Sequence, residues 1–148
     1  MTKRTIETSI DIAADTGVVW RILTDFPAYP DWNPFIRSIE GRPSQGERLS
    51  VLIQPPGQGA MRFRPRVQSS EQQHVFSWLG NLLIPGLFDG RHEFRLEALG
   101  QTTRLHHREA FSGLLTPLVW NKMEKPTRAG FEAMNQAIKT RAESLTKQ

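Results

Sequence analysis

The sequence contains no cysteine, and this absence excludes several kinds of chemistry at once. Without cysteine the chain can form no disulfide, hold no metal through thiolates and use no cysteine nucleophile. It also has no uninterrupted apolar run near the ~18 residues that a membrane-spanning helix needs. We therefore expect a soluble protein without stable membrane insertion, and we assign it to the cytoplasm.

Signatures of cofactor-dependent enzymes are missing as well. The sequence has no glycine-rich phosphate loop, no GxSxG nucleophile elbow and no HExxH metal-binding pair. Its one tyrosine, Tyr29, lies in a proline-rich turn, where packing accounts for it. We expect no cofactor and no bound metal, so any catalysis would be acid/base chemistry on a bound molecule.

The charge pattern does not indicate a nucleic-acid partner. The 19 basic and 15 acidic residues give a formal net charge of +4. The densest basic group, which we call the arginine row, is Arg62, Arg64 and Arg66, whose spacing is typical of the solvent-facing side of a strand. A nucleic-acid surface combines clustered cations with interleaved aromatic residues. We therefore expect the arginine row to be solvated and no nucleic acid to bind.

The 148 residues suit one domain, residues 1–148, whose pattern begins with a strand and a short helix. Apolar and polar residues alternate over 5–12, which predicts a half-buried strand. Asp15 is placed to cap a helix whose apolar positions lie within 18–23. Pro27 and Pro30 are expected to end this helix in a tight, aromatic turn.

Further strands and a long helix follow. Alternation and turn residues predict strands at 35–40, 48–54, 61–69, 74–79, 91–97 and 104–111. The apolar loop 80–88 is expected to cover an apolar surface. From Thr116 to Leu145 apolar residues recur every three or four positions, which predicts a helix with Thr116 as N-cap and Pro117 at its first position. Pro126 is expected to kink or break this helix.

The hairpin formed by 91–97 and 104–111 specifies its own register, because a slip of one residue would turn one strand over. With a turn centred at 100–101, the core face carries the pairs His92–Glu109, Phe94–His107 and Leu96–Leu105. The other face carries two pairs of opposite charge, Glu93–Arg108 and Glu97–Arg104. Such cross-strand charge pairs are favourable and support this register independently.

The order of elements predicts an α+β fold in which a curved antiparallel sheet of about seven strands wraps around a long C-terminal helix, with two short helices after the first strand. Four motifs, VVW at 18–20, DFPAYPDWNP at 25–34, HREAFSGLL at 107–115 and GFEAMN at 130–135, occur in an order that resembles the SRPBCC superfamily. This helix-grip family includes START lipid-transfer domains, the major birch-pollen allergen and the polyketide cyclase/dehydrase group. The resemblance implies a mainly apolar cavity between sheet and helix that binds small hydrophobic molecules and, in some relatives, cyclises or dehydrates polyketides.

The inward-facing positions supply the candidates for the wall of such a cavity. From the strands these are Phe63, Phe76, Trp78, His92, Phe94, His107, Glu109 and Phe111. From the helix they are Trp120, Met123, Phe131 and Met134. A packed core has the same spacing as a pocket wall, so the aromatic and methionine positions are also consistent with plain core packing.

Three of these candidates, His92, His107 and Glu109, are ionisable and costly to bury without partners. In the simplest interpretation Glu109 accepts a hydrogen bond from His92 and ties two strands together. In the functional interpretation the pair orients a ligand's polar group or acts as an acid/base couple, which makes the three residues the catalytic candidates. A metal site formed by the three is a further interpretation, disfavoured because no helical ligand spacing accompanies it.

These patterns favour one function and leave two alternatives open. We expect the protein to bind a small hydrophobic molecule, lipid-like or aromatic and polyketide-like, in the cavity. The alternative is a cofactor-free cyclase or dehydratase that uses His92, His107 and Glu109. The second alternative is a protein-interaction module built on loop 80–88 and the arginine row. The patterns predict neither the identity of the ligand nor the oligomeric state.

Overall fold

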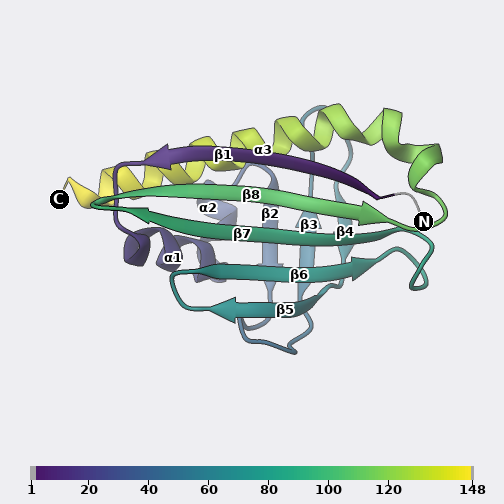
Figure 1. Cartoon of the computed structure of the whole chain (residues 1–148), viewed down its shortest axis with the longest axis horizontal. Helices are drawn as coiled ribbons and strands as arrows, with labels where there is room; N and C mark the ends of the chain where they lie inside the picture. Colours follow the sequence, from purple (N-terminus) through teal and green to yellow (C-terminus); the bar gives the residue numbers. More distant parts are fainter. Residues whose placement is uncertain (1–2, 148) are drawn as a thin grey trace.

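Eight strands within the described residues, 3–147, form two antiparallel sheets in a computed structural model of the chain (Figure 1). The larger sheet has the strand order β1 (Arg4–Ile12), β8 (Thr102–Ser112), β7 (Asp89–Leu99), β6 (Val75–Asn81), β5 (Arg66–Glu71). The smaller sheet has the order β2 (Ile36–Glu40), β3 (Ser50–Ile53), β4 (Met61–Phe63). The expected α+β class is confirmed, with a second sheet that the patterns did not predict.

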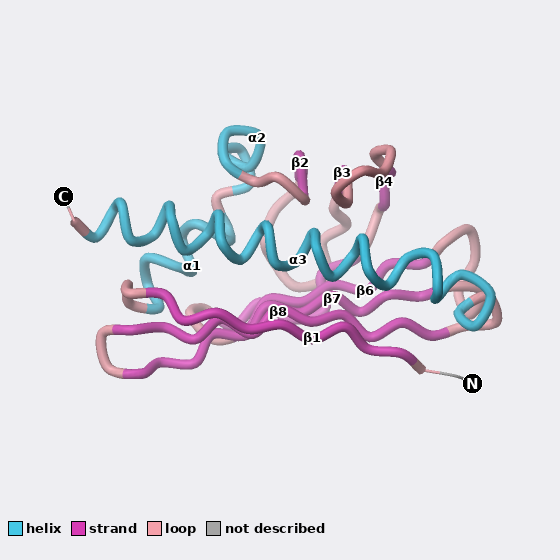
Figure 2. Tube along the Cα trace, turned by 90° about the horizontal axis from the view of Figure 1, so that it is seen from above, coloured by secondary structure: helices cyan, strands magenta, loops and turns pink. Residues whose placement is uncertain are grey.

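Two short helices follow β1, and one long helix follows β8. Between β1 and β2 lie α1 (Thr16–Thr24), the 3-10 turn η1 (Phe26–Ala28) and α2 (Tyr29–Trp32). The long helix α3 spans Thr116–Thr146 and runs along one face of the larger sheet, on the same side as the smaller sheet (Figure 2). The expected arrangement of a long helix held by a sheet is therefore confirmed.

The short helices follow from capping and burial. Asp15 caps α1 as expected, since its Oδ1 accepts a hydrogen bond from a first-turn backbone N–H at 3.0 Å. As expected, α1 ends before Pro27, and Pro30 lies in the first turn of α2, where a backbone N–H has no helical partner anyway. Tyr29 is buried and donates its hydroxyl to the carbonyl oxygen of Leu23 at 2.6 Å. Burial raises the pKa of Tyr29, which fits the packing role expected for it.

The expected strand 61–69 is two strands, because Pro65 interrupts it. Proline has no N–H to donate to a neighbouring strand, and Pro65 is buried where the chain leaves β4 in the smaller sheet and enters β5 in the larger one. The arginine row therefore runs from one sheet to the other. Arg62, Arg64 and Arg66 are all exposed, as expected.

The start and the middle of α3 differ from the expectation. Leu115 occupies the N-cap position, and its N–H donates to the carbonyl of Leu87 at 2.9 Å, which anchors the chain one residue before the predicted cap. Thr116 is instead the first helical residue, and its buried hydroxyl has no hydrogen-bond partner. Pro126 does not break α3, which continues past it for five further turns. Burial of side chains such as Phe131 outweighs the one backbone hydrogen bond that proline removes.

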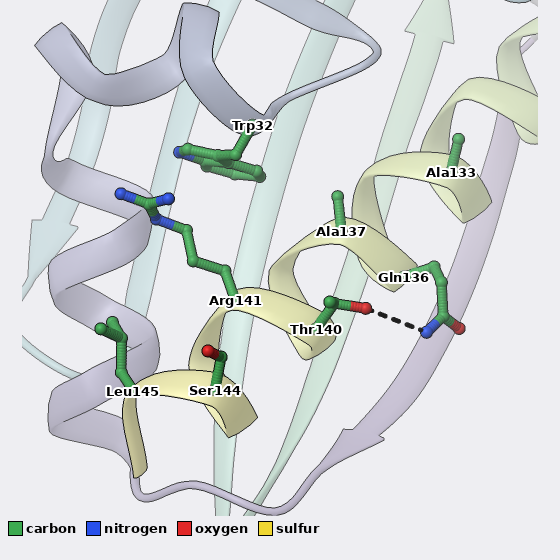
Figure 3. Close-up of a pocket in the computed structure, with 8 residues that line it drawn as sticks. All are labelled: Trp32, Ala133, Gln136, Ala137, Thr140, Arg141, Ser144 and Leu145. Atoms are coloured by element: carbon green, nitrogen blue, oxygen red, sulfur yellow. Dashed lines mark hydrogen bonds between the residues drawn. The ribbon is translucent and has the colours of Figure 1, made fainter. Parts of the chain in front are cut away.

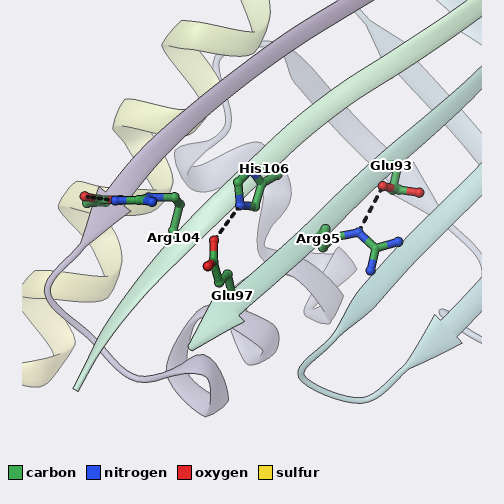
Figure 4. Close-up of polar contacts among 6 residues, drawn as sticks. Glu93, Arg95, Glu97, Arg104 and His106 are labelled. Carbon is green, nitrogen blue, oxygen red and sulfur yellow. Dashed lines mark hydrogen bonds and ion pairs between the residues drawn. The ribbon is translucent and has the colours of Figure 1, made fainter. Parts of the chain in front are cut away.

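The register of β7 and β8 is the predicted one. The core-facing pairs are His92–Glu109, Phe94–His107 and Leu96–Leu105, and the charged outer pairs also stand opposite each other. Three of these four charges nevertheless bind other partners. Glu93 lies 3.4 Å from Arg95 and Glu97 lies 3.0 Å from His106 (Figure 4). Arg104 binds Asp11 of β1 at 2.8 Å. Register determines which backbones face each other, while long side chains can reach along a strand or to the next one.

The loop between β6 and β7 is only partly buried, so the expectation that loop 80–88 covers an apolar surface is wrong for its tip. Leu83 and Ile84 are 85% and 62% exposed. Phe88, near the end of the loop, is half-buried and stacks on Phe111 of β8 with a ring-centroid distance of 5.7 Å. One end of the loop therefore covers the sheet, while its tip presents aliphatic side chains to solvent.

The core beneath α3 depends on a close approach at Gly130. A Cβ atom on Gly130 would overlap the ring of Phe35, which is itself 2% exposed, so a larger residue there would force the helix away. Phe35 packs edge-to-face against Phe131 with a centroid distance of 5.6 Å. The contacts of Phe35 with Gly130 and Phe131 therefore position the middle of α3 over the sheet.

Candidate functional site

A cavity of about 580 Å³ lies between α3 and the two sheets. Strands β6, β7 and β8, strands β3 and β4, and the first half of α3 form its walls, and residues of the β3–β4 and β6–β7 loops complete it. The lining is mostly apolar and includes Phe35, Val51, Ile53, Phe63, Trp78, Phe88, Phe111, Leu115, Val119 and Met123. Cavities of this size and composition are typical of sites for small organic molecules.

The predicted site residues divide into those that line the cavity and those that lie behind its wall. Lining residues among them are Phe63, Trp78, Glu109, Phe111 and Met123. Buried residues that do not line it are Phe76, His92, Phe94, His107, Phe131 and Met134. Trp120 is half-buried and packs against Phe111 with a centroid distance of 5.8 Å. Alternation predicts the face on which a side chain lies, and the structure decides how deep it is.

Several lining residues were absent from the prediction. Val51 and Ile53 come from the smaller sheet, whose existence the patterns did not show. Val119 and Thr127 lie on the same face of α3 as Met123, four residues away on either side, and this spacing could have identified them. The missed residues show that both sheets, and not the larger one alone, enclose the cavity.

Exposed aliphatic side chains flank the cavity where the β6–β7 loop meets the start of α3. Leu82 and Leu115 line the cavity, and the adjacent Leu83 and Leu114 are exposed. Two backbone hydrogen bonds, of 3.1 and 2.9 Å, connect this loop to the segment before α3. We call the exposed set, Leu83, Ile84, Leu114 and Leu118, the apolar rim. It lies beside the cavity and is no part of its lining.

Glu109 brings charge into this apolar surrounding. Two ionisable residues line the cavity: Lys122 is exposed, whereas the side chain of Glu109 is only 16% exposed. Glu109 Oε1 lies 3.2 Å from Nδ1 of His92, which is fully buried and stacks on Trp78 with a centroid distance of 4.8 Å. The predicted pairing of His92 with Glu109 is therefore confirmed. Glu109 lines the cavity, whereas His92 is buried next to it and does not line the cavity.

The pair belongs to a longer series of hydrogen bonds that we call the polar chain: Glu109, His92, His107, Asn135 and Thr8. His92 Nε2 lies 2.7 Å from His107 Nε2, and His107 Nδ1 lies 2.8 Å from Asn135 Oδ1. Asn135 Nδ2 then donates to Thr8 Oγ1 at 2.9 Å. Asn135 on α3 and Thr8 on β1 were not among the predicted residues, since neither lies on the hairpin that carries the other three.

The polar chain has a defined direction. Thr8 donates its hydroxyl proton to the backbone carbonyl of His107 at 2.9 Å, so its oxygen accepts from the amide nitrogen of Asn135. The amide oxygen of Asn135 therefore faces His107 and accepts, which places a proton on Nδ1 of His107. A neutral His107 then has a bare Nε2, so His92 must donate from its own Nε2.

Burial keeps His107 neutral. The pKa of His107 is well below its ordinary value because the residue is fully buried, and the neighbouring His92 lowers it further, while the hydrogen bond from Nδ1 to Asn135 partly opposes the shift. The ring of His107 also stacks on Phe131 of α3, with a centroid distance of 4.0 Å and an angle of 4° between the planes. His107 is thus a neutral link between the polar chain and the core.

The metal interpretation finds no geometric support in residues 3–147. No group of three His, Cys, Asp or Glu side chains in this range is arranged to hold a metal ion. His92, His107 and Glu109 cannot converge on one metal ion, because His92 lies between the other two and directs one ring nitrogen at each of them.

No helix within residues 3–147 has the length and apolar character required to cross a membrane.

A second hollow, of about 570 Å³, lies on the outer side of α3 beside Trp32 (Figure 3). Residues from Ala133 to Leu145 and Trp32 line it, and none of the lining side chains belongs to a buried residue. None of the predicted site residues contributes to it. We therefore take the cavity at Glu109 as the candidate functional site.

The family follows from comparison of the sequence with known families. A family described as polyketide cyclase / dehydrase and lipid transport matches residues 3–143, and the chain belongs to this family. The resemblance to the SRPBCC superfamily is therefore confirmed, and the fold and cavity described above are those of a helix-grip protein. No curated protein matches the sequence.

Solved structures support the same fold. The Zhui aromatase/cyclase from Streptomyces sp. R1128 has a TM-score of 0.81 at 19% identity, over 98% of this chain and 96% of that one. A START superfamily protein from Mycobacterium smegmatis has a TM-score of 0.73 at 23% identity, over 95% and 98%. Norcoclaurine synthase from Thalictrum flavum has a TM-score of 0.76 at 13% identity, over 98% and 97%. At these identities the likeness establishes the fold, and the ligand must be argued from this chain's own residues.

Proposed function

We propose that the protein binds a small, largely apolar molecule in the cavity between α3 and the two sheets, with the molecule's polar group directed at Glu109. One observation carries this proposal: a cavity of about 580 Å³ with mostly apolar walls contains one carboxylate that is only 16% exposed. An apolar body would gain from leaving water, and a single polar contact would orient it. Membership in a family described as including lipid transport is consistent with this proposal.

The proposal predicts that filling the cavity abolishes binding of a neutral apolar probe. N-phenyl-1-naphthylamine should bind the wild-type protein with an increase in its fluorescence. Val119→Trp should weaken this binding at least about tenfold, because the indole occupies the space that the probe needs. The matched control is Asn121→Trp, an exposed position on α3 outside the cavity, which should leave the affinity unchanged. Equal affinity in the wild type and Val119→Trp would contradict the proposal.

A second candidate function is cofactor-free acid/base catalysis on the bound molecule, by a cyclase or dehydratase. The polar chain favours it, because Glu109 at the cavity wall is joined through His92 to a network that can hold a proton. Here Glu109→Gln should abolish turnover of a bound substrate while its affinity survives. Turnover that persists in Glu109→Gln would exclude Glu109 as the acid or base.

The protein-interaction alternative finds its support in the apolar rim, where Leu83 and Leu118 are 85% and 76% exposed. The rim lies next to the cavity, however, and the cavity explains more of the site: the enclosed volume, the apolar lining and the carboxylate with its buried partners. For this reason ligand binding is the function that we favour.

A further inference from the structure

We infer that the cavity selects molecules that present a hydrogen-bond donor, a hydroxyl or an amine, to Glu109 Oε2, and discriminates against molecules whose polar end can only accept. This inference rests on the proposed function and adds to it the chemical class of the ligand. It follows from the direction of the polar chain and from the position of one oxygen atom.

The polar chain leaves one proton between His92 and Glu109. His92 donates from Nε2 to His107, so its Nδ1 either carries a second proton or is bare. In the first case His92 is an imidazolium that donates to a carboxylate, and in the second a protonated Oε1 of Glu109 donates to Nδ1. In both cases the proton lies between Nδ1 of His92 and Oε1 of Glu109, and these two atoms are 3.2 Å apart.

The other oxygen of Glu109 therefore carries no proton in either state. Oε2 is an ionised carboxylate oxygen in the first case and the carbonyl oxygen of a carboxylic acid in the second, and both are acceptors. Within residues 3–147 the hydrogen bond of Glu109 to His92 uses Oε1, and Oε2 accepts no hydrogen bond from a side chain or the backbone. The side chain of Glu109 is only 16% exposed, so a ligand in the cavity would displace the water at Oε2, and a donor on that ligand would replace the lost hydrogen bond.

Gly90 makes room for Oε2 at the cavity wall. A Cβ atom at position 90 would overlap with Oε2 of Glu109, and Gly90 and Glu109 both line the cavity. The missing side chain thus leaves room for the oxygen at the wall, on the side where a ligand would lie. A carboxylate on the ligand would repel an ionised Glu109, and an ether or ketone there would leave two acceptors facing each other without a proton between them.

A matched series on one ring system tests the inference. We would measure by calorimetry the affinities of 2-naphthol, 2-naphthalenemethanol, 2-methoxynaphthalene, 2-naphthoate and naphthalene for the wild-type protein. The two hydroxyl compounds should bind at least about tenfold more tightly than 2-methoxynaphthalene and more tightly than 2-naphthoate. Equal affinities for 2-naphthol and 2-methoxynaphthalene, or the tightest binding by 2-naphthoate, would overturn the inference.

Variants at Glu109 separate the role of the oxygen from that of the apolar walls. Glu109→Leu should remove the preference for 2-naphthol over 2-methoxynaphthalene and keep the affinity for naphthalene. Glu109→Gln should retain the preference, because its amide N–H can donate to a bare Nδ1 of His92 while its carbonyl oxygen takes the place of Oε2. The control Glu93→Leu, on the outer face of the same hairpin, should behave as the wild type. A preference that persists in Glu109→Leu would contradict the inference.

Failure of the inference and failure of the proposed function give different results. If all five compounds bind with similar affinity, the cavity binds apolar molecules and only the donor preference is wrong. If none binds, while circular dichroism shows a folded protein, the proposed function fails and the inference fails with it. Long-range ¹H–¹⁵N correlation spectra of the histidines supply a check that needs no ligand, since Nδ1 of His107 should be protonated and its Nε2 bare. The opposite tautomer would remove the directional argument.

Discussion

Replacement of Phe131 by alanine is expected to lower the free energy of unfolding by roughly 3–5 kcal/mol, the range measured for large aromatic side chains in well-packed cores. Phe131 is fully buried at the middle of α3. Its ring stacks on His107 at 4.0 Å and packs against Phe35 at 5.6 Å, so truncation would remove contacts with a strand of the larger sheet and with the segment before β2. The surrounding groups cannot all move inward, because Gly130 already holds α3 close to Phe35.

Urea unfolding followed by circular dichroism measures this loss. The control is Leu118→Ala, also on α3 but 76% exposed, which should change the free energy of unfolding by about 0.5 kcal/mol or less. If Phe131→Ala cost less than about 1 kcal/mol, α3 would not be docked on the sheet at this point, and the wall of the cavity described here would be wrong.

Acidification below pH ~6.5 is expected to destabilise the protein through His107, with a slope approaching about 1.4 kcal/mol per pH unit. Burial holds the pKa of His107 in the folded protein well below the ordinary value of 6.5. Between these two pKa values the unfolded chain binds a proton that the folded chain does not, so the free energy of unfolding falls as the pH falls. The contribution is complete above the unfolded pKa and is lost progressively down to the folded pKa.

The measurement is a series of urea unfolding curves at half-unit steps from pH 7.5 to pH 5. His107→Gln should flatten the dependence over this range, because the proton-binding group is gone, although it lowers the stability at pH 7.5 by disturbing the polar chain. His74→Gln is the matched control, since His74 is exposed, and it should retain the wild-type slope. Equal slopes for the wild type and His107→Gln would contradict a buried, neutral His107.

Local patterns were enough to predict the hairpin and the long helix. In β7 and β8 a period of two places His92, Phe94, His107 and Glu109 on the core face, and one short turn leaves a single register that buries that face. In α3 the recurrence of apolar residues every three or four positions places Phe131 against the sheet. Both inferences succeed because the residues involved are neighbours within one element or across one turn.

Only the tertiary structure decided the second sheet and the shape of the cavity. The patterns showed a strand at 61–69, but the change of sheet at Pro65 depends on which backbones are free to pair, and that is a property of the whole fold. The alternation of apolar and polar residues also did not predict how deeply a side chain is buried. Phe63 and Phe111 line the cavity, whereas Phe76 and Phe94, which also face inward, lie in the packed core.

At the candidate site, too, one feature could be predicted from the sequence and another depended on the tertiary structure. The pairing of His92 with Glu109 could be predicted from the sequence by itself, because the two residues are opposite each other in one hairpin. The direction of the polar chain could not, because it depends on Thr8 in the first strand and Asn135 in the last helix, 127 positions apart. A single sequence contains no signal that joins two such positions. They meet because α3 packs across β1 and β8, and that packing determines the direction of the polar chain.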